Sequence, residues 1–164
     1  MNAKTAKQEQ FFELLRSFTT AMLTTRSLDG ELRARPMAIA RVAEDASVWF
    51  ATDVTSMKVD EIAKAPRVNV SFQSRDTFLS LSGFASVHDD RKMIGEYWQS
   101  TWNIWFPDGP EDPRLALLRV QGQYGEYWDM SGLKSVAYLW QAGRSLLTGE
   151  PPQNVGDHDK VKLS

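Results

Sequence analysis

A series of short β-rich runs separated by turn residues is the feature that most constrains this chain. The first two runs, "TTAMLTTR" and "ELRARPMAIARV", flank "SLDG", whose Asp29-Gly30 pair is a strong hairpin signal. A second turn, "AEDA", leads into the apolar run "SVWFAT". Because strands joined by such short turns pair antiparallel, we expect a meander that ends at Thr52.

The chain returns to strand patterns in its second half. The run "RVNVSFQ" alternates with period two, and "TFLSLSGFASVH" continues the alternation, with Gly83 expected at a bulge or bend. Two further strands, "RLALLRVQ" and "YGEYWDM", are predicted on the two sides of Gly122. Six or seven short strands with helices at the margins predict a mainly β, α+β domain built as a small antiparallel barrel.

Helical patterns interrupt the strands at four places. Apolar residues at helical spacing predict an amphipathic helix over residues 5–18. Shorter helices are expected over residues 53–66, 90–99 and 135–149. No linker or repeat divides the chain, so we predict one domain over residues 1–149, followed by a polar tail over residues 150–164.

The bulk composition removes several classes of function. With 164 residues, 42% of them hydrophobic, and a net charge of −2, the chain has no basic field for nucleic acid or an anionic membrane. There is no cysteine, which excludes disulfides and zinc–thiolate sites, and two histidines are too few for most metal sites. Neither a signal-peptide core nor a membrane-length apolar run is present, so we expect a cytoplasmic protein.

Five polar residues make a candidate anion site. Arg33 and Arg35 share one face of a strand, and guanidinium groups suit phosphate. Lys58 lies in the first turn of a predicted helix, where a cation opposes the helix dipole and a bound anion relieves it. Thr52 and Ser56 add hydroxyl donors nearby. Arginines on an exposed strand and a lysine on a surface helix are also common, so the residues alone leave a purely structural role open.

An aromatic segment, "WNIWFPDGPEDP", combines Trp102, Trp105 and Phe106 with the prolines and glycine of a loop. Such a loop is poorly able to bury three large rings by itself. We therefore expect these rings to contact a partner subunit or a flat ligand. No nucleophile elbow, Walker loop or dinucleotide fingerprint is present, which favours a cofactor as the source of any chemistry.

Four motifs occur in a familiar order: "RARPM", "VWFATDVTSMKVDEIAKAPRVNVSF", "WFPDGPEDPRLALLRV" and "GEYWD". Over residues 8–142 the chain resembles the general stress protein 26 group of the pyridoxamine 5′-phosphate oxidase-like, FMN-binding split-barrel family. The resemblance implies a six-stranded antiparallel split β-barrel flanked by helices. It also implies a homodimer with one FMN in each of two equivalent clefts between the subunits.

The resemblance assigns roles to individual residues. Arg33 or Arg35, together with Ser56 and Lys58, would hold the FMN phosphate, and Thr52 would lie at the phosphate or the ribityl chain. Pro36 and Met37 would lie beside the flavin ring. The second subunit would contribute either the loop that contains Trp102 and Trp105, or Trp128.

Two functions remain open at this stage. The first is an FMN-dependent oxidoreductase that exchanges electrons with a small-molecule donor or acceptor, and the second is a non-catalytic flavin carrier or redox sensor in the stress response. FAD, a deazaflavin or haem are weaker alternatives to FMN, and the shortage of histidines argues against haem. The oxidase's substrate-binding arginine and histidine pattern near the C-terminus is absent, which disfavours oxidation of pyridoxamine phosphate.

Overall fold

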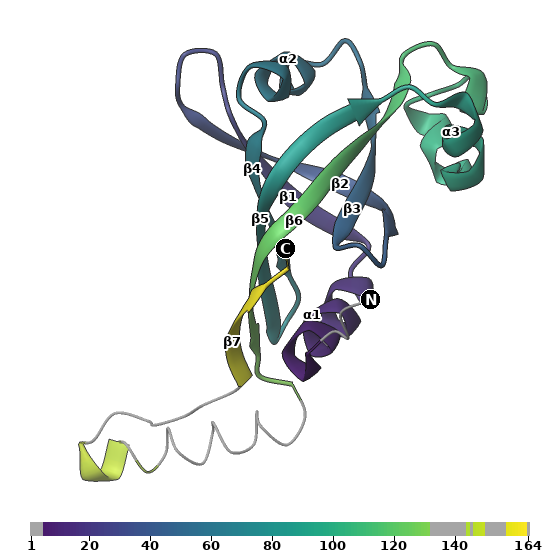
Figure 1. Cartoon of the computed structure of the whole chain (residues 1–164). Helices are drawn as coiled ribbons and strands as arrows, with labels where there is room; N and C mark the ends of the chain where they lie inside the picture. Colours follow the sequence, from purple (N-terminus) through teal and green to yellow (C-terminus); the bar gives the residue numbers. More distant parts are fainter. Residues whose placement is uncertain (1–4, 132–143, 145, 150–156, 164) are drawn as a thin grey trace.

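The computed structural model describes residues 5–131, 144, 146–149 and 157–163 (Figure 1). Most of the helix predicted over residues 135–149 lies outside the described residues. Within the described part of the chain, no helix is long and apolar enough to cross a membrane.

The strands close into a barrel. They are β1 (Thr20–Arg26), β2 (Leu32–Val42), β3 (Ser47–Asp53), β4 (Arg67–Gln73), β5 (Thr77–His88), β6 (Leu115–Asp129) and β7 (Asp157–Lys162). Among the described residues they form one antiparallel sheet in the order β3-β2-β1-β4-β5-β6-β7, and β3 also pairs with β6. That extra pairing closes β1 to β6 into a six-stranded barrel, which confirms the predicted fold (Figure 1).

Strand β6 is shared between the barrel and an added edge strand. Its first part pairs with β3 from Leu115 to Gln121, and its last part pairs with β7 from Tyr124 to Asp129. The sequence predicted two strands here, broken at Gly122, and that prediction is wrong. Gly122 continues the strand, and its backbone N–H donates to the Ala46 carbonyl at 3.0 Å.

The second difference concerns the C-terminal residues, which the sequence assigned to a polar tail. Part of that segment is β7, whose side chains are almost all polar and of which only Val161 is buried. An edge strand needs little apolar surface, because its main contribution is a row of backbone hydrogen bonds to β6. Periodicity of hydrophobic residues is therefore a weak signal for such a strand.

The helices lie at the two ends of the barrel. The helices are α1 (Ala6–Arg16), α2 (Met57–Lys64) and α3 (Arg91–Tyr97). Two 3-10 segments, η1 (Ser100–Ile104) and η2 (Gly109–Glu111), follow α3 and lead to β6. Figure 1 shows α2 and α3 at one end and α1 at the other. Thr5 caps the N-terminus of α1 in a capping box with Gln8. Asp90 caps the N-terminus of α3, where its carboxylate accepts from the Met93 N–H at 3.1 Å.

Two hydrophobic clusters bury the two faces of β6. The larger fills the barrel, and the smaller lies outside it under α3 and the aromatic segment, with Trp49, Ile94, Trp102, Phe106, Leu115 and Leu117 as buried members. Trp102 is only 1% exposed, and Phe106 is buried beside it. The expectation that all three rings of this segment face a partner or a ligand is therefore wrong for two of them. Trp105, at 58% exposure, is the one ring left largely uncovered.

We predict that Gly83→Ala destabilises the protein by about 2 kcal/mol or more. Gly83 sits at a register shift between β5 and β6, as the sequence indicated, and a Cβ there would lie 1.9 Å from the Gln121 carbonyl oxygen. Urea denaturation measures the change in the free energy of unfolding. Gly95→Ala is the control, because a Cβ at Gly95 would meet no atom within 4 Å. Gly95 lies in helix α3, where alanine is favoured over glycine, so this substitution should raise the free energy of unfolding by about 0.5 to 1 kcal/mol. Equal stability of the two variants would contradict the proposed close packing at Gly83.

Candidate functional site

A cavity of about 430 Å³ lies where β2, β3, the start of α2 and the aromatic segment meet. Six of the ten residues predicted for the cofactor line it: Pro36, Met37, Thr52, Lys58, Trp102 and Trp105. These residues come from four separate segments of the chain. The structure therefore brings most of the candidate set into one place.

The turn between β3 and α2 positions Lys58. The Asp53 carboxylate accepts hydrogen bonds from the backbone N–H and the hydroxyl of Thr55, at 2.8 and 2.7 Å, and these bonds hold the turn. The Thr55 hydroxyl is also the main reason that the pKa of Asp53 lies below its usual value. The hydroxyl of Ser56 donates to the Asp53 carbonyl at 2.6 Å, so Ser56 stands at the N-cap position of α2 without capping the helix by its side chain.

Lys58 is half-buried and has no carboxylate at ion-pair distance among the described residues. Its Nζ donates to the Ser56 hydroxyl at 2.8 Å. Burial, and then repulsion from Arg35, lower the pKa of Lys58, while Asp53 and Glu61 act in the opposite direction. A cation held under these conditions is stabilised by an anion in the cavity.

Both arginines predicted for the anion site, Arg33 and Arg35, form ion pairs with carboxylates. Arg35 contacts Glu61 at 2.9 Å and also donates to Thr25, and Glu61 is only 1% exposed. This buried pair ties α2 to β1 and β2. Arg33 contacts Asp29 at 2.8 Å on the exposed hairpin. Neither arginine lines the cavity, so Lys58 supplies the positive charge that the predicted set places there.

Two buried polar atoms at the cavity lack a partner. Among the described residues, Thr52 Oγ1 and Trp102 Nε1 form no hydrogen bond, and a third such atom, Arg119 Nε, belongs to a residue away from the cavity. An unpaired buried donor or acceptor costs about 1 to 3 kcal/mol. Both atoms belong to residues that line the same cavity, and each would gain a hydrogen bond if a polar ligand there reached it.

Sequence reasoning missed Asp53 and Arg114, which also line the cavity. Arg114 immediately precedes β6, and its carbonyl accepts from the Val54 N–H at 2.8 Å. This approach depends on the pairing of β3 with β6, between segments about 60 residues apart in sequence. No local pattern in the sequence marks that pairing.

Trp128, the last predicted residue, lies outside the cavity. It lines a neighbouring hollow of about 320 Å³ on the outer face of the sheet, which shares Pro36 with the cavity. Its ring stacks on His158 at 5.0 Å between centroids and 7° between planes. His158 also contacts the Glu126 carboxylate at 2.8 Å.

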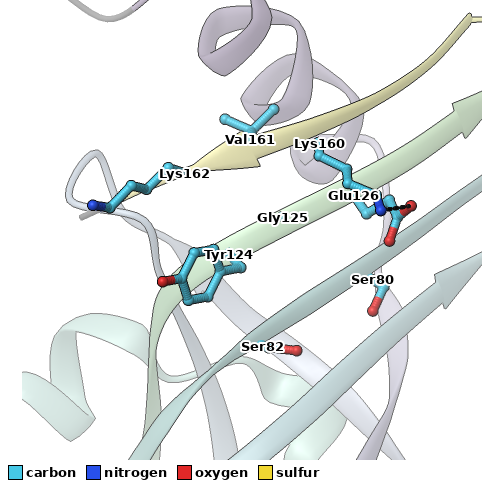
Figure 2. A pocket seen from close by; sticks show the side chains of 8 residues that line it. All are labelled: Ser80, Ser82, Tyr124, Gly125, Glu126, Lys160, Val161 and Lys162. Atoms are coloured by element: carbon cyan, nitrogen blue, oxygen red, sulfur yellow. Dashed lines mark ion pairs between the residues drawn. The ribbon is translucent and has the colours of Figure 1, made fainter.

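A third hollow, a groove of about 370 Å³, lies across β5, β6 and β7. Figure 2 shows the side chains that line it. Glu126 lies beside Lys160 there, at 3.8 Å. Asn69 donates to the hydroxyls of Ser80 and Ser82 at 2.8 and 3.1 Å. The groove shares no lining residue with the cavity and holds none of the predicted site residues, so the cavity is the stronger candidate site.

No metal centre is indicated in the described part of the chain. Among those residues, no group of three or more His, Cys, Asp or Glu side chains is placed to hold an ion. The polar groups of the cavity lining are instead a lysine, an arginine paired with an aspartate, a threonine hydroxyl and an indole N–H, among apolar side chains. Such a set suits a largely apolar organic ligand with an anionic end.

The sequence and the fold define the family. Residues 6–153 match the pyridoxamine 5′-phosphate oxidase-like family, and the chain belongs to it. The chain is also 31% identical over 153 residues to Protein bli-3 of Neurospora crassa, covering 84% of this chain and 73% of that protein.

Solved structures show the same fold. The general stress FMN/FAD binding protein of Xanthomonas citri is 31% identical, with a TM-score of 0.65 over 76% of this chain and 89% of that one. The General Stress Protein 26 of Bacillus anthracis is 22% identical, with a TM-score of 0.67 over 75% of this chain and 94% of that one. The family match thus confirms the resemblance to the pyridoxamine 5′-phosphate oxidase-like family, and these structures share the fold of this chain.

We predict opposite effects from removing the hydroxyl at two buried threonines. Thr52→Val deletes an unpaired hydroxyl and should raise the free energy of unfolding by up to about 1 kcal/mol. Thr25→Val is the matched control, because the Thr25 hydroxyl donates to buried Glu61 at 2.6 Å, and its loss should cost about 1 to 3 kcal/mol. Urea denaturation of both variants without added ligand tests this. A loss at Thr52 as large as that at Thr25 would mean that the Thr52 hydroxyl is already paired in the protein.

Proposed function

We propose that this protein binds FMN in the cavity and acts as a cytoplasmic, flavin-dependent oxidoreductase of the general stress type. The observation that carries the proposal is that Lys58 lines the cavity together with Thr52 and Trp102. The buried Thr52 Oγ1 and Trp102 Nε1 atoms have no hydrogen-bond partner among the described residues. The cysteine-free composition is compatible with a reducing compartment, and the cytoplasmic location stays a prediction.

Each lining residue has a role in holding the flavin. Lys58 would form a charge-assisted hydrogen bond to the phosphate, supported by the free N–H groups at the start of α2. Thr52 and Trp102 would donate to polar groups of the ligand. Met37 and Phe106 provide an apolar wall for the ring and exclude water from it. A bound flavin itself supplies the electron transfer.

The charge in the cavity favours FMN over FAD. Among the described residues, Lys58 is the cavity-lining cation without a carboxylate at ion-pair distance, since Arg114 lies near both Asp53 and Asp112. FMN carries one phosphate and FAD carries two. A cavity with one uncommitted cation matches the single phosphate.

A non-catalytic carrier or redox sensor is the second candidate. It is favoured by the lining of the cavity, which contains no histidine among the described residues and whose one carboxylate, Asp53, is engaged by Thr55 and Arg114. Anaerobic mixing with NADH or NADPH separates the two functions. Bleaching of the flavin and turnover with an added acceptor support an oxidoreductase, whereas a flavin that stays oxidised with every donor tested supports a carrier.

A second copy of the chain is the partner that we propose for the outer face of the sheet. The hollow on this face continues from the cavity through Pro36 and leaves Met22 and Trp128 partly exposed. A homodimer formed there would enclose the open side of the cavity and would bring Trp128 or Trp105 of one subunit toward the flavin of the other.

We predict that Lys58→Gln weakens FMN binding by about 1.5 to 3 kcal/mol, the contribution of a hydrogen bond to a charged group. Titration of the apoprotein with FMN, followed by flavin fluorescence, gives the dissociation constant. Lys64→Gln, in the last turn of the same helix and exposed, is the control and should bind as the unaltered protein does. An unchanged dissociation constant for Lys58→Gln would place the phosphate elsewhere. If the unaltered protein takes up no FMN, the proposed function fails.

We further predict that Met22→Glu shifts the dimer toward monomer. Burying an unpaired carboxylate in an interface costs more than 1.4 kcal/mol, so the dimer dissociation constant should rise at least about tenfold. Sedimentation velocity over a dilution series measures this constant. Leu28→Glu, on the exposed turn between β1 and β2, is the control. A dimer equally stable in both variants would show that this face is not the interface.

A further inference from the structure

Arg114 connects two parts of the cavity that the strands do not join directly. Its Nη2 donates to the Trp105 carbonyl at 2.9 Å, and its Nη1 lies 3.6 Å from the Asp53 carboxylate. Its guanidinium carbon also lies 6.0 Å from the centre of the Phe106 ring. One side chain therefore contacts the turn after β3 and the aromatic wall, here defined as residues Trp102–Phe106.

The Asp53 side of this connection leads to the anion-binding end of the cavity. The Asp53 carbonyl accepts from the Ser56 hydroxyl at 2.6 Å, and the Ser56 hydroxyl accepts from Lys58 Nζ at 2.8 Å. A continuous series of polar contacts thus runs from Lys58 through Ser56, Asp53 and Arg114 to the backbone of Trp105.

The aromatic wall has few other attachments at this edge. Trp102 and Phe106 are buried, but Trp105 is largely exposed, so packing covers its side chain only in part. The N–H groups of Trp105 and Phe106 both donate to the Trp102 carbonyl at 2.9 Å, which shapes the turn without fixing it to the barrel. Arg91 anchors the far side of the loop through the Asp112 carbonyl at 3.0 Å, away from the cavity.

We propose that Arg114 is a positioning residue that holds the Trp105 edge of the aromatic wall against the anion-binding end of the cavity. We expect this contact to slow the release of a bound flavin, and this part of the inference rests on the proposed function. When the guanidinium is removed, the Trp105 carbonyl loses its donor and the wall loses its contact with Asp53. The wall then opens more often, and the ligand leaves faster.

Two measurements on the full-length protein test this role. Hydrogen exchange of the apoprotein, read on peptides that cover residues 99–109, reports opening of the wall. Stopped-flow release of FMN gives the dissociation rate constant. For Arg114→Gln we expect faster exchange confined to residues 99–109 and release about tenfold faster or more, the size of effect that loss of a charged hydrogen bond produces.

Arg119→Gln is the matched control. Arg119 lies within β6, close to Arg114 in sequence. Like Arg114, it contacts an aspartate (Asp45, at 2.6 Å) and lies over an aromatic ring, but it does not line the cavity. Arg114→Lys keeps a positive charge near Asp53 on a shorter side chain. Its rate constant for FMN release should therefore lie between those of the unaltered protein and Arg114→Gln. This variant also keeps the test decisive if Arg114→Gln fails to fold.

The outcomes separate the inference from the proposed function. Exchange and release in the Arg114 variants that equal those of Arg119→Gln would overturn the positioning role, even if FMN binds tightly. If the unaltered protein binds no FMN, the proposed function fails, and faster exchange confined to residues 99–109 in the Arg114 variants still supports the positioning of the wall.

Discussion

The pairing of β3 with β6 is the interaction on which the rest of the structure depends. Seven residue pairs, from Ser47 with Gln121 to Asp53 with Leu115, close the sheet into a barrel. The closure buries the inner face of both strands, and it brings the turn after β3 beside Arg114. Without the pairing of β3 with β6, Thr52 and Lys58 would lie far from the aromatic wall. The cavity would then lack the part of its lining that the aromatic wall provides.

The distribution of charge decides which cation is left for a ligand. Arg35 and Glu61 form a pair in which Glu61 is fully buried, and removing either partner of such a pair is costly because the other charge stays uncompensated. This pair therefore belongs to the structure of the barrel. Among the described residues, the Nζ of Lys58, next to this pair, donates a hydrogen bond to the Ser56 hydroxyl alone, and the nearby Arg35 guanidinium makes the lysine charge still less favourable without an anion.

Most of the strands, and six of the residues that line the cavity, were predictable because their signals are local. Alternation identified β4, and Asp29-Gly30 identified the hairpin of β1 and β2, since the turn and its strands are neighbours in sequence. The edge strand β7 and the burial of Trp102 were not predictable in this way. A polar edge strand is stabilised by backbone hydrogen bonds, and Trp102 is buried by β6 and α3, which are distant in sequence.

The sequence by itself determined the antiparallel meander, the family and the types of residue available for an anion and a ring. Only the tertiary structure decided how those residues are used. In the fold, Arg33 and Arg35 form ion pairs with carboxylates, whereas Lys58 lines the cavity. Thr52 and Trp102, whose side-chain hydroxyl and indole N–H are unpaired, line the same cavity. The physical reason is that pairing, burial and charge neutralisation depend on neighbours in space, and closing the barrel is what sets those neighbours.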